Sequence, residues 1–364
     1  MRFPEFTEEW EETTLGKISE ITKGSGISKD QLSEQGSPCI LYGELYTKYK
    51  SEIIDEVYSR TELDSSSLVK SKANDVIIPC SGETAIDIST ARCVPFNNIL
   101  LGGDLNIIRL KHDDGGFFAY QLNGARKKDI ARVAQGVSVV HLYGENLKHI
   151  RVYHPAIEEQ KKITRLLSLI DERIATQNKI IEKYESLIKG IAQNVARNNK
   201  PNIRLSECLE CSSSTLQESD VCENGTYPVY GANGIVGYLD NYNAEKEAVY
   251  IIKDGSGVGT VSYVTGKCSA TGTLNTLQAK EGYSLQYLYY MLKVFNFEPY
   301  KTGMAIPHIY FKDYGKAKIF CPSYTEQLKY VGVLSTIDNK LSAEQSILTD
   351  LSLQKQYLLH QMFI

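Results

Sequence analysis

Apolar residues recur in steps of three and four from residue 157 to residue 191, with a polar interruption at Gln177, and this is the spacing of one face of an α-helix. Pro155 precedes the run, Glu158 and Glu159 fall in its first turn, and Lys200-Pro201 ends it. About forty residues that rise 1.5 Å each form a rod of roughly 60 Å, so a single apolar stripe of this length requires a partner helix. The predicted seam on this helix consists of Ile163, Leu167, Ile170, Ile174 and Ile181.

A second helix of similar length and pattern is predicted near the end of the chain, and it can serve as that partner. Two helices of matched length, separated by a globular segment whose ends can turn back, can pair antiparallel as an intramolecular coiled coil. The alternative is that each helix packs only on its own half of the chain, and the matched stripes make this the less favoured interpretation. The predicted seam on the second helix consists of Leu334, Ile337, Leu341, Leu348 and Leu351.

The two helical segments belong to a tandem duplication. Shifting the sequence by 167 positions superposes identical residues, including Gly136 with Gly303, His141 with His308, Tyr143 with Tyr310, Pro155 with Pro322, Glu159 with Glu326, Gln160 with Gln327, Leu167 with Leu334 and Asp171 with Asp338. In the globular halves the offset varies, and there Leu15 matches Leu205, Pro38 matches Pro228, Asn106 matches Asn275 and Tyr120 matches Tyr287. A repeat of this size predicts two domain-sized halves related by a pseudo-two-fold axis.

Short apolar runs bounded by Gly, Pro, Asn and Ser predict strands in both globular halves. Segments 117–133 and 285–295 have helical spacing instead, the first being broken near Gly124. The predicted fold class is therefore α+β, with two mixed β cores and two long antiparallel helices. The predicted division is 1–153 for the first globular domain, 154–200 for the central helix, 201–321 for the second globular domain and 322–364 for the C-terminal helix.

Length and composition favour two domains of ordinary size in a soluble, cytoplasmic protein. The sequence has no run of eighteen apolar residues and no secretory signal, so its eight cysteines are expected to be reduced thiols. The net charge of −4 excludes a protein that is uniformly basic, so DNA binding requires local clusters of Lys and Arg. The most basic cluster of the first half is Arg126, Lys127, Lys128 and Arg132.

No motif for catalysis or metal binding is recognisable. Residues 254–259 (DGSGVG) are rich in glycine, but a phosphate-binding loop must be followed by a helix, and the next residues predict a strand, so we interpret them as a hairpin turn. Cys208 and Cys211 form a lone CxxC without a neighbouring histidine, which argues against a zinc site. G-x-S-x-G, HExxH and adenine-methyltransferase motifs are missing. The sequence therefore predicts no catalytic residue, no metal and no cofactor in this chain.

Two residue pairs recur before both helices: His141 with Tyr143, and His308 with Tyr310. They could contact DNA or a protein partner, or they could be structural residues in which a histidine ring nitrogen caps the local backbone. The structural interpretation is favoured because both copies precede a helix at the same distance. The 24 tyrosines, many of them in loops with Gly and Lys, are a further feature typical of recognition surfaces, although about half of them are expected to be core or rim residues with their hydroxyls satisfied.

Several stretches resemble the specificity subunit of type I restriction-modification systems: the opening RFPEFTEEWEETTLGKISEITKGSG, the block 155–163 with Asp171, and its second copy 322–327 with Asp338. The resemblance covers essentially the whole chain. It implies a non-catalytic subunit whose globular halves each read one half of a bipartite, gapped DNA target, while the paired helices set the gap. It also implies two docked methyltransferase (modification) subunits and restriction subunits, which would hold S-adenosylmethionine, ATP and Mg, and no contact with a membrane. The second helix departs from the pattern because it is poorer in basic residues, so the two helices need not contact a partner equally.

The predicted DNA-contacting residues are polar and aromatic residues of glycine-rich loops together with basic residues. In the first half they are Lys23, Ser25, Tyr42, Tyr46, Lys48, Arg92, Lys127 and Lys128, and in the second half Tyr230, Asn233, Tyr238, Lys253, Ser256, Lys267 and Thr271. Two other hypotheses stay open. A stand-alone nuclease or methyltransferase predicts cofactor binding or turnover by the chain alone, and a coiled-coil scaffold for proteins only predicts no DNA binding even at low salt.

Overall fold

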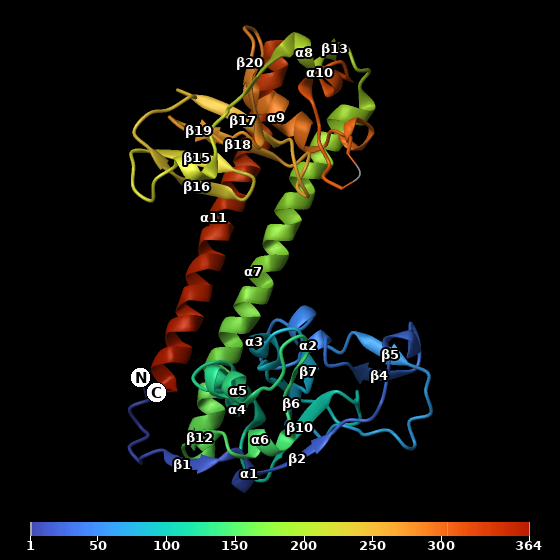
Figure 1. Ribbon diagram of the computed structural model, residues 1–364, viewed down its shortest axis with the longest axis vertical. Helices are drawn as coiled ribbons and strands as arrows, with labels where there is room; N and C mark the ends of the chain where they lie inside the picture. The colour runs from blue at the N-terminus through green and yellow to red at the C-terminus, as the bar shows by residue number, and fades with distance from the viewer. Residues whose placement is uncertain (1, 304, 364) are drawn as a thin grey trace. The chain divides into compact units, whose positions relative to one another are not determined.

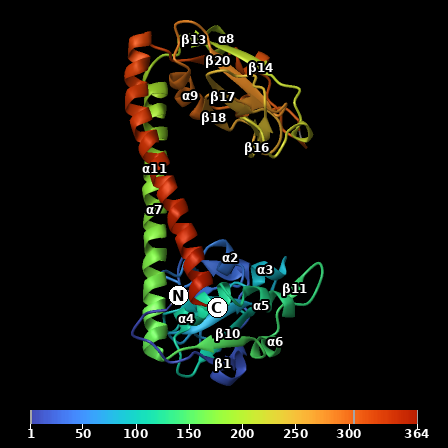
Figure 2. The same ribbon diagram turned by 90° about the vertical axis from the view of Figure 1, so that its left-hand side faces the viewer.

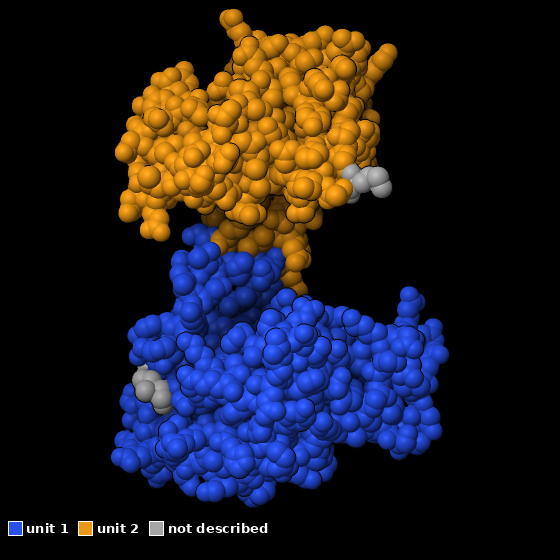
Figure 3. Space-filling view, viewed as in Figure 1, with its two compact units in different colours: residues 1–178, 346–364 blue, residues 179–345 orange. Residues whose placement is uncertain are grey.

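The computed structural model describes residues 2–303 and 305–363. The chain forms two compact units (Figure 3). Unit 1 comprises Met1–Asn178 with Ser346–Ile364, and unit 2 comprises Lys179–Gln345. Each unit therefore contains one globular half and a segment of each long helix. The predicted four-part division, which treats the helices as separate parts, stays a prediction.

Helices α7 (Ile157–Asn198) and α11 (Tyr324–Met362) are the two long helices, with 42 and 39 residues. Their segments lie side by side within each unit (Figures 1 and 2). In unit 1, Asp171 near the start of α7 has its Oδ1 atom 2.6 Å from the Nζ atom of Lys355 near the end of α11. In unit 2, Ile188 of the second half of α7 and Leu341 of the first half of α11 line one groove. The paired segments thus run in opposite directions in both units, which confirms the predicted antiparallel pairing.

Most residues of the predicted seam are buried. Ile163, Leu167, Ile170, Ile181, Leu334 and Leu341 are at most 8% exposed, and Ile174, Ile337, Leu348 and Leu351 are half-buried. In unit 1, Ile163, Leu167 and Ile170 share a core cluster with Phe117 of the globular half and Leu358 of α11. The alternative, in which each helix packs only on its own half of the chain, is therefore wrong for α7 in unit 1, because α7 packs on its globular half and also on α11. Gln177 is 7% exposed, so it lies within the buried stripe and does not interrupt it.

The globular half of unit 1 is built on a four-stranded antiparallel sheet in the order β2-β10-β6-β8, whose central strand β6 is buried at every position. The strands are β2 (Ser19–Lys23), β10 (Leu105–Leu110), β6 (Asp75–Pro79) and β8 (Arg92–Val94). A second sheet contains β3 (Leu32–Ser33), β5 (Ser59–Thr61), β4 (Ser37–Ile40) and β9 (Leu100–Leu101), and two-stranded pairs join β1 (Glu11–Thr14) to β12 (Arg151–His154) and β7 (Ser81–Gly82) to β11 (Val140–His141).

The described residues of this half also form the α-helices α1 (Leu15–Ile18), α2 (Glu44–Thr47), α3 (Ala85–Ile88), α4 (Gly115–Asn123), α5 (Lys127–Val133) and α6 (Gly144–Lys148), and the short 3-10 helix η1 (Lys29–Gln31). The predicted helical segment 117–133 is thus two helices, separated at the predicted break near Gly124. Helix α4 is buried along most of its length, because it lies between the main sheet and α7.

The globular half of unit 2 repeats the four-stranded sheet in the order β14-β20-β17-β18. These strands are β14 (Leu209–Ser213), β20 (Leu274–Ala279), β17 (Glu247–Ile252) and β18 (Val261–Thr265), and a smaller sheet holds β16 (Gly234–Leu239), β15 (Tyr227–Gly231) and β19 (Ser269–Ala270). Strand β13 (Ile203–Arg204) pairs with β21 (Lys318–Ile319), and the helices are α8 (Leu205–Cys208), α9 (Leu285–Lys293) and α10 (Phe311–Tyr314). Residues 254–259 connect the antiparallel strands β17 and β18, which confirms the predicted hairpin turn.

Equivalent contacts show how the two repeats correspond. Asp114 before α4 and Ser284 before α9 each cap their helix by accepting a hydrogen bond from the backbone N–H three residues later. Tyr120 follows Asp114 by six residues and Tyr290 follows Ser284 by six residues, so Tyr120 and Tyr290 are equivalent in the two repeats. The sequence match of Tyr120 with Tyr287 was therefore wrong by one helical turn, because sequence identity alone does not detect a change in the length of the loop before the helix.

Candidate nucleic-acid interface

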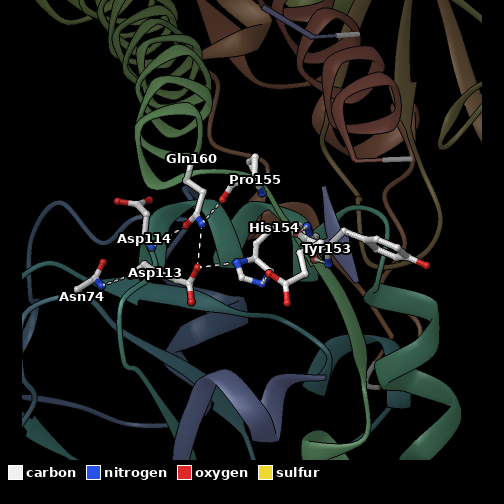
Figure 4. A network of polar contacts seen from close by, with 9 residues as sticks. Asn74, Asp113, Asp114, Tyr153, His154, Pro155 and Gln160 are labelled. Atoms are coloured by element: carbon white, nitrogen blue, oxygen red, sulfur yellow. Dashed lines mark hydrogen bonds and ion pairs between the residues drawn. The ribbon is translucent and has the colours of Figure 1, made fainter. Parts of the chain in front are cut away.

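The repeated block before each long helix fastens that helix to its globular half (Figure 4). The Gln160 Nε2 atom donates to the Pro155 carbonyl at 2.9 Å and to the Asp113 carboxylate at 2.8 Å, while its Oε1 atom accepts from the backbone N–H of Asp114 at 2.9 Å. In unit 2, Gln327 makes the matching bonds to the Pro322 carbonyl and the Ser284 N–H, both at 2.9 Å. One glutamine thus joins the start of the long helix to the capped start of α4 or α9.

A buried charged cluster fixes the end of α11 in unit 1. The Lys355 ammonium lies 2.5 Å from the Glu52 carboxylate and 2.6 Å from that of Asp171, and Tyr120 donates its hydroxyl to Asp171 at 2.7 Å. Burial, followed by the charge of Glu52, raises the pKa of Asp171 to about 6, although Lys355 and Tyr120 oppose this shift. In unit 2 the matching tyrosine bond, from Tyr290 to Asp338, is 3.0 Å long.

Three predicted DNA-contacting residues of unit 1 come together around an open groove. Tyr42, Tyr46 and Lys48 line it beside Ser28 and Lys29. The Lys48 ammonium bonds to the Glu44 carboxylate at 2.7 Å, so part of its charge is already compensated. Tyrosine rings and a lysine along one groove can stack on bases and contact phosphates.

Lys23 and Ser25 lie next to this groove along the chain, but they differ in availability. Lys23 is exposed at the end of β2. The Ser25 hydroxyl accepts a hydrogen bond from the backbone N–H of Val69 at 2.8 Å, so it holds two segments of unit 1 together. The geometry gives Ser25 a structural role and leaves Lys23 free to meet a ligand.

The remaining basic candidates of unit 1 form a separate group. Arg92 is 7% exposed, and its guanidinium donates to the carbonyls of Leu45 at 3.1 Å and Tyr49 at 2.8 Å. Lys127 is half-buried, and burial, with a contribution from Arg92, lowers its pKa. Only Lys128 is fully exposed. The burial of Arg92 contradicts its assignment as a DNA contact, because its donors are occupied by internal carbonyls.

Unit 2 presents its candidates on the small sheet and in the loop after β17. Asn233 is exposed at the β15–β16 turn, and Tyr230 and Tyr238 are half-buried on those two strands. The Lys267 ammonium lies 4.7 Å from the ring centre of Tyr242 and 5.8 Å from that of Tyr227. Lys253 and Ser256 lie apart from them, after β17. Thr271 is 1% exposed, so it too is a structural residue and not a surface contact.

Comparison with known families identifies the chain. The sequence profile described as "Type I restriction modification DNA specificity domain" matches residues 7–186 and 201–352, one copy in each half. The chain belongs to this family. The fold, with two specificity domains of mixed sheets and a long helix following each, is therefore the one that the sequence resemblance implied.

Individual relatives agree with the family. The EcoprrI specificity subunit of Escherichia coli is 27% identical over 116 residues, which are 32% of this chain and 29% of that protein. A Mycoplasma genitalium protein named as a type I specificity subunit is 24% identical over 274 residues, 68% of this chain and 70% of that protein. The crystal structure of a type I S subunit from M. genitalium shares the fold, with a TM-score of 0.70 and 19% identity over 100% of this chain and 97% of that one.

The sequence interpretation missed some exposed residues of this specificity subunit. The favoured role of His141 and His308 as backbone caps was wrong: the His308 Nδ1 atom lies 2.6 Å from the Asp254 carboxylate, and His141 stacks with Tyr143. Tyr143 and Tyr310 are 46% and 47% exposed. Recurrence in both halves was a usable signal for all four residues, but sequence alone does not reveal exposure.

Among the described residues, no helix is long and apolar enough to span a lipid bilayer. Within the same residues, no three His, Cys, Asp or Glu side chains are grouped so that they could hold a metal ion.

Proposed function

We propose that this chain is the DNA-recognition subunit of a type I restriction-modification complex and acts in the cytoplasm. Each globular domain, 1–153 and 201–321, reads one half of a bipartite target, and the helices 154–200 and 322–364 set the length of the unread gap. The observation that carries the proposal is the duplication of a DNA specificity domain within one chain. Two copies that differ in their surface residues are suited to two different half-sites.

The base-reading surfaces are built from different elements in the two units. In unit 1 the groove beside α2 carries Tyr42, Tyr46 and Lys48. In unit 2 the β15–β16 hairpin replaces α2 and carries Asn233 and Tyr238. The Lys267 ammonium, which lies over the rings of Tyr227 and Tyr242, is a further candidate contact of this unit. Side chains that recognise base edges determine sequence, so this difference is what two unlike half-sites require.

The long helices provide the platform for the methyltransferase subunits. Helix α11 exposes six large apolar side chains, each between 41% and 58% exposed: Tyr324, Leu328, Val333, Ile347, Leu353 and Tyr357. Exposed apolar residues in such number are typical of protein–protein contacts. Helix α7 exposes only Leu169 and Leu187 to a comparable degree among its described residues. This agrees with the expectation that the two helices contact partners unequally.

Catalysis belongs to the partners in this proposal. Methyl transfer from S-adenosylmethionine takes place on the modification subunits, and ATP- and Mg-dependent cleavage on the restriction subunits. The purified chain alone should give no calorimetric signal with S-adenosylmethionine, whereas the complex with modification subunits should bind it. Turnover by the chain alone would favour the stand-alone enzyme.

The decisive test is an exchange of residues 201–321 for the corresponding segment of another specificity subunit. Methylation by the reconstituted complex should change in one half of the target sequence only. A change in both halves, or in neither, would contradict the modular account. Exchange of residues 1–153 serves as the matched control and should change the other half.

A further inference from the structure

One pocket of unit 2 is lined at backbone positions that have equivalents in unit 1. In unit 2 it is lined by residues that include Ser213, Lys253, His308 and Tyr310. It lies where the ends of β14 and β17 meet the segment that leads into α10. Its repeat-equivalent side chains in unit 1 are Lys23, Cys80, His141 and Tyr143.

The backbone pairing establishes this correspondence. Lys23 lies opposite Asn106 across β2 and β10, as Ser213 lies opposite Asn275 across β14 and β20. On the neighbouring strand, the carbonyl of Cys80 accepts a hydrogen bond from Leu142 N, and the carbonyl of Lys253 accepts one from Ile309 N. Position 23 therefore corresponds to position 213, and position 80 corresponds to position 253.

Each set of positions contains a lysine, but the two lysines come from different strands. Unit 1 has Lys23 beside Cys80, whereas unit 2 has Lys253 beside Ser213. Burial raises the pKa of Cys80 to about 11, and the nearby Lys23 ammonium opposes that shift. Burial likewise raises the pKa of Cys211 to about 11, and there Lys253 opposes it. Each unit thus places a lysine at this end of its main sheet, although no single alignment column contains both lysines.

These ammonium groups are available to a ligand. Across the described part of the chain, neither the Lys23 ammonium nor the Lys253 ammonium takes part in a hydrogen bond or an ion pair. The pocket of unit 2 also contains the Asp254 carboxylate, which is bonded to His308, and a second cation, Lys312, which offsets that charge. Lysine, histidine and tyrosine are all hydrogen-bond donors, which is the set that suits an anionic oxygen.

We propose that the pocket of unit 2 and the equivalent positions of unit 1, Lys23, His141 and Tyr143, each bind one phosphate group of the DNA backbone, in a contact that is independent of base sequence. This inference rests on the proposed function. A feature that both units share cannot distinguish two unlike half-sites, whereas phosphate contacts position a protein on DNA without reading it. The Lys, His and Tyr positions are shared, while the groove at Tyr42 and the small sheet of unit 2 are not. The shared positions therefore place the two units on the DNA, and the unshared surfaces read bases.

The test uses the full chain in complex with its modification subunits and two duplexes, one with the mapped target and one with scrambled sequence. Lys253→Met should weaken binding of both duplexes by the same factor, roughly tenfold at about 0.1 M salt, and reduce the slope of log affinity against log salt by about 0.9. Lys246→Met, just before the opposite end of β17, is the matched control and should change neither quantity by as much.

Moving the lysine gives the sharper result. The double variant Lys253→Cys with Ser213→Lys carries the ammonium on the β14 side, as unit 1 does, and residue 213 is exposed and can accept the longer side chain. This variant should recover the wild-type salt slope. Lys23→Met repeats the test in unit 1, so the result does not depend on one variant folding.

A loss of affinity that is confined to the target duplex, or a change in the methylated sequence, would show that the lysines contact bases and would overturn the proposal. Unchanged affinity and salt slope in both Lys253→Met and Lys23→Met would overturn it as well. Failure of the wild-type complex to bind either duplex would instead count against the proposed function itself.

Discussion

Replacing Lys355 by Met tests how the end of α11 is held in unit 1. The Lys355 ammonium contacts Glu52 and Asp171 at 2.5 and 2.6 Å, and the two carboxylate side chains are only 9% and 8% exposed. The substitution leaves two neighbouring buried carboxylates without their ion-pair partner, and breaking such a cluster on one side costs about 3–5 kcal/mol. For a unit of this size, each kcal/mol lowers the melting temperature by about 2–4 °C, so unit 1 should melt roughly 6–20 °C lower.

Scanning calorimetry of the full chain, with hydrogen exchange followed in residues 346–362, measures this loss. Lys340→Met removes an exposed lysine of the same helix and should leave the transition within about 2 °C of the wild type. The triple variant Glu52→Gln, Asp171→Asn, Lys355→Met replaces the whole cluster by neutral groups and should recover most of the loss, because no charge stays buried alone. A Lys355→Met protein as stable as the wild type, or a triple variant no better than the single one, would refute the reasoning.

Three further predictions concern the helices. Burial holds the pKa of Asp171 at about 6, above its unfolded value of about 3.9, so the folded state binds a proton more readily than the unfolded state. The free energy of unfolding should therefore fall as pH rises from about 4 to 6. Urea titrations at several pH values measure this dependence, and Asp171→Asn should flatten it. Gln160→Ala and Gln327→Ala each remove the amide that joins a long helix to its globular half, so each should lower the free energy of unfolding by about 1–3 kcal/mol. Hydrogen exchange should also become faster at the start of α4 or α9. The control Gln193→Ala should cause neither change. Inserting seven residues after position 178 and seven after position 345 keeps the helical seam in register and adds about 10 Å to each helix. The unread gap of the DNA target should then lengthen by roughly three base pairs, which methylation mapping measures.

The long helices could be predicted because a periodic pattern over forty residues is a strong local signal, and the duplication supplied the partner. The role of the repeated glutamines could not be predicted. Gln160 contacts the start of α4, 46 residues earlier in the chain, and such a contact exists only in the folded unit. The sequence marked the residue as repeated without indicating what it binds.

Candidate DNA-contacting residues were harder to choose from the sequence because residue type does not report burial. Arg92 has the chemistry of a DNA contact, but its guanidinium donates to carbonyls 43 and 47 residues away. Lys23 and Lys253 could not be matched with each other by aligning the two repeats. Both lie at the same end of the main sheet of their unit although their aligned partners are Ser213 and Cys80, so only strand pairing reveals this correspondence.

Single-molecule methylation sequencing tests the central claim most directly. The genome of a host that carries this chain with its modification subunits should contain a bipartite, gapped motif with methylated adenine in each half. Methylation of this motif should be lost when the gene for this chain is deleted. Adenine methylation that persists without the chain, or a motif that is continuous with no gap, would contradict the account.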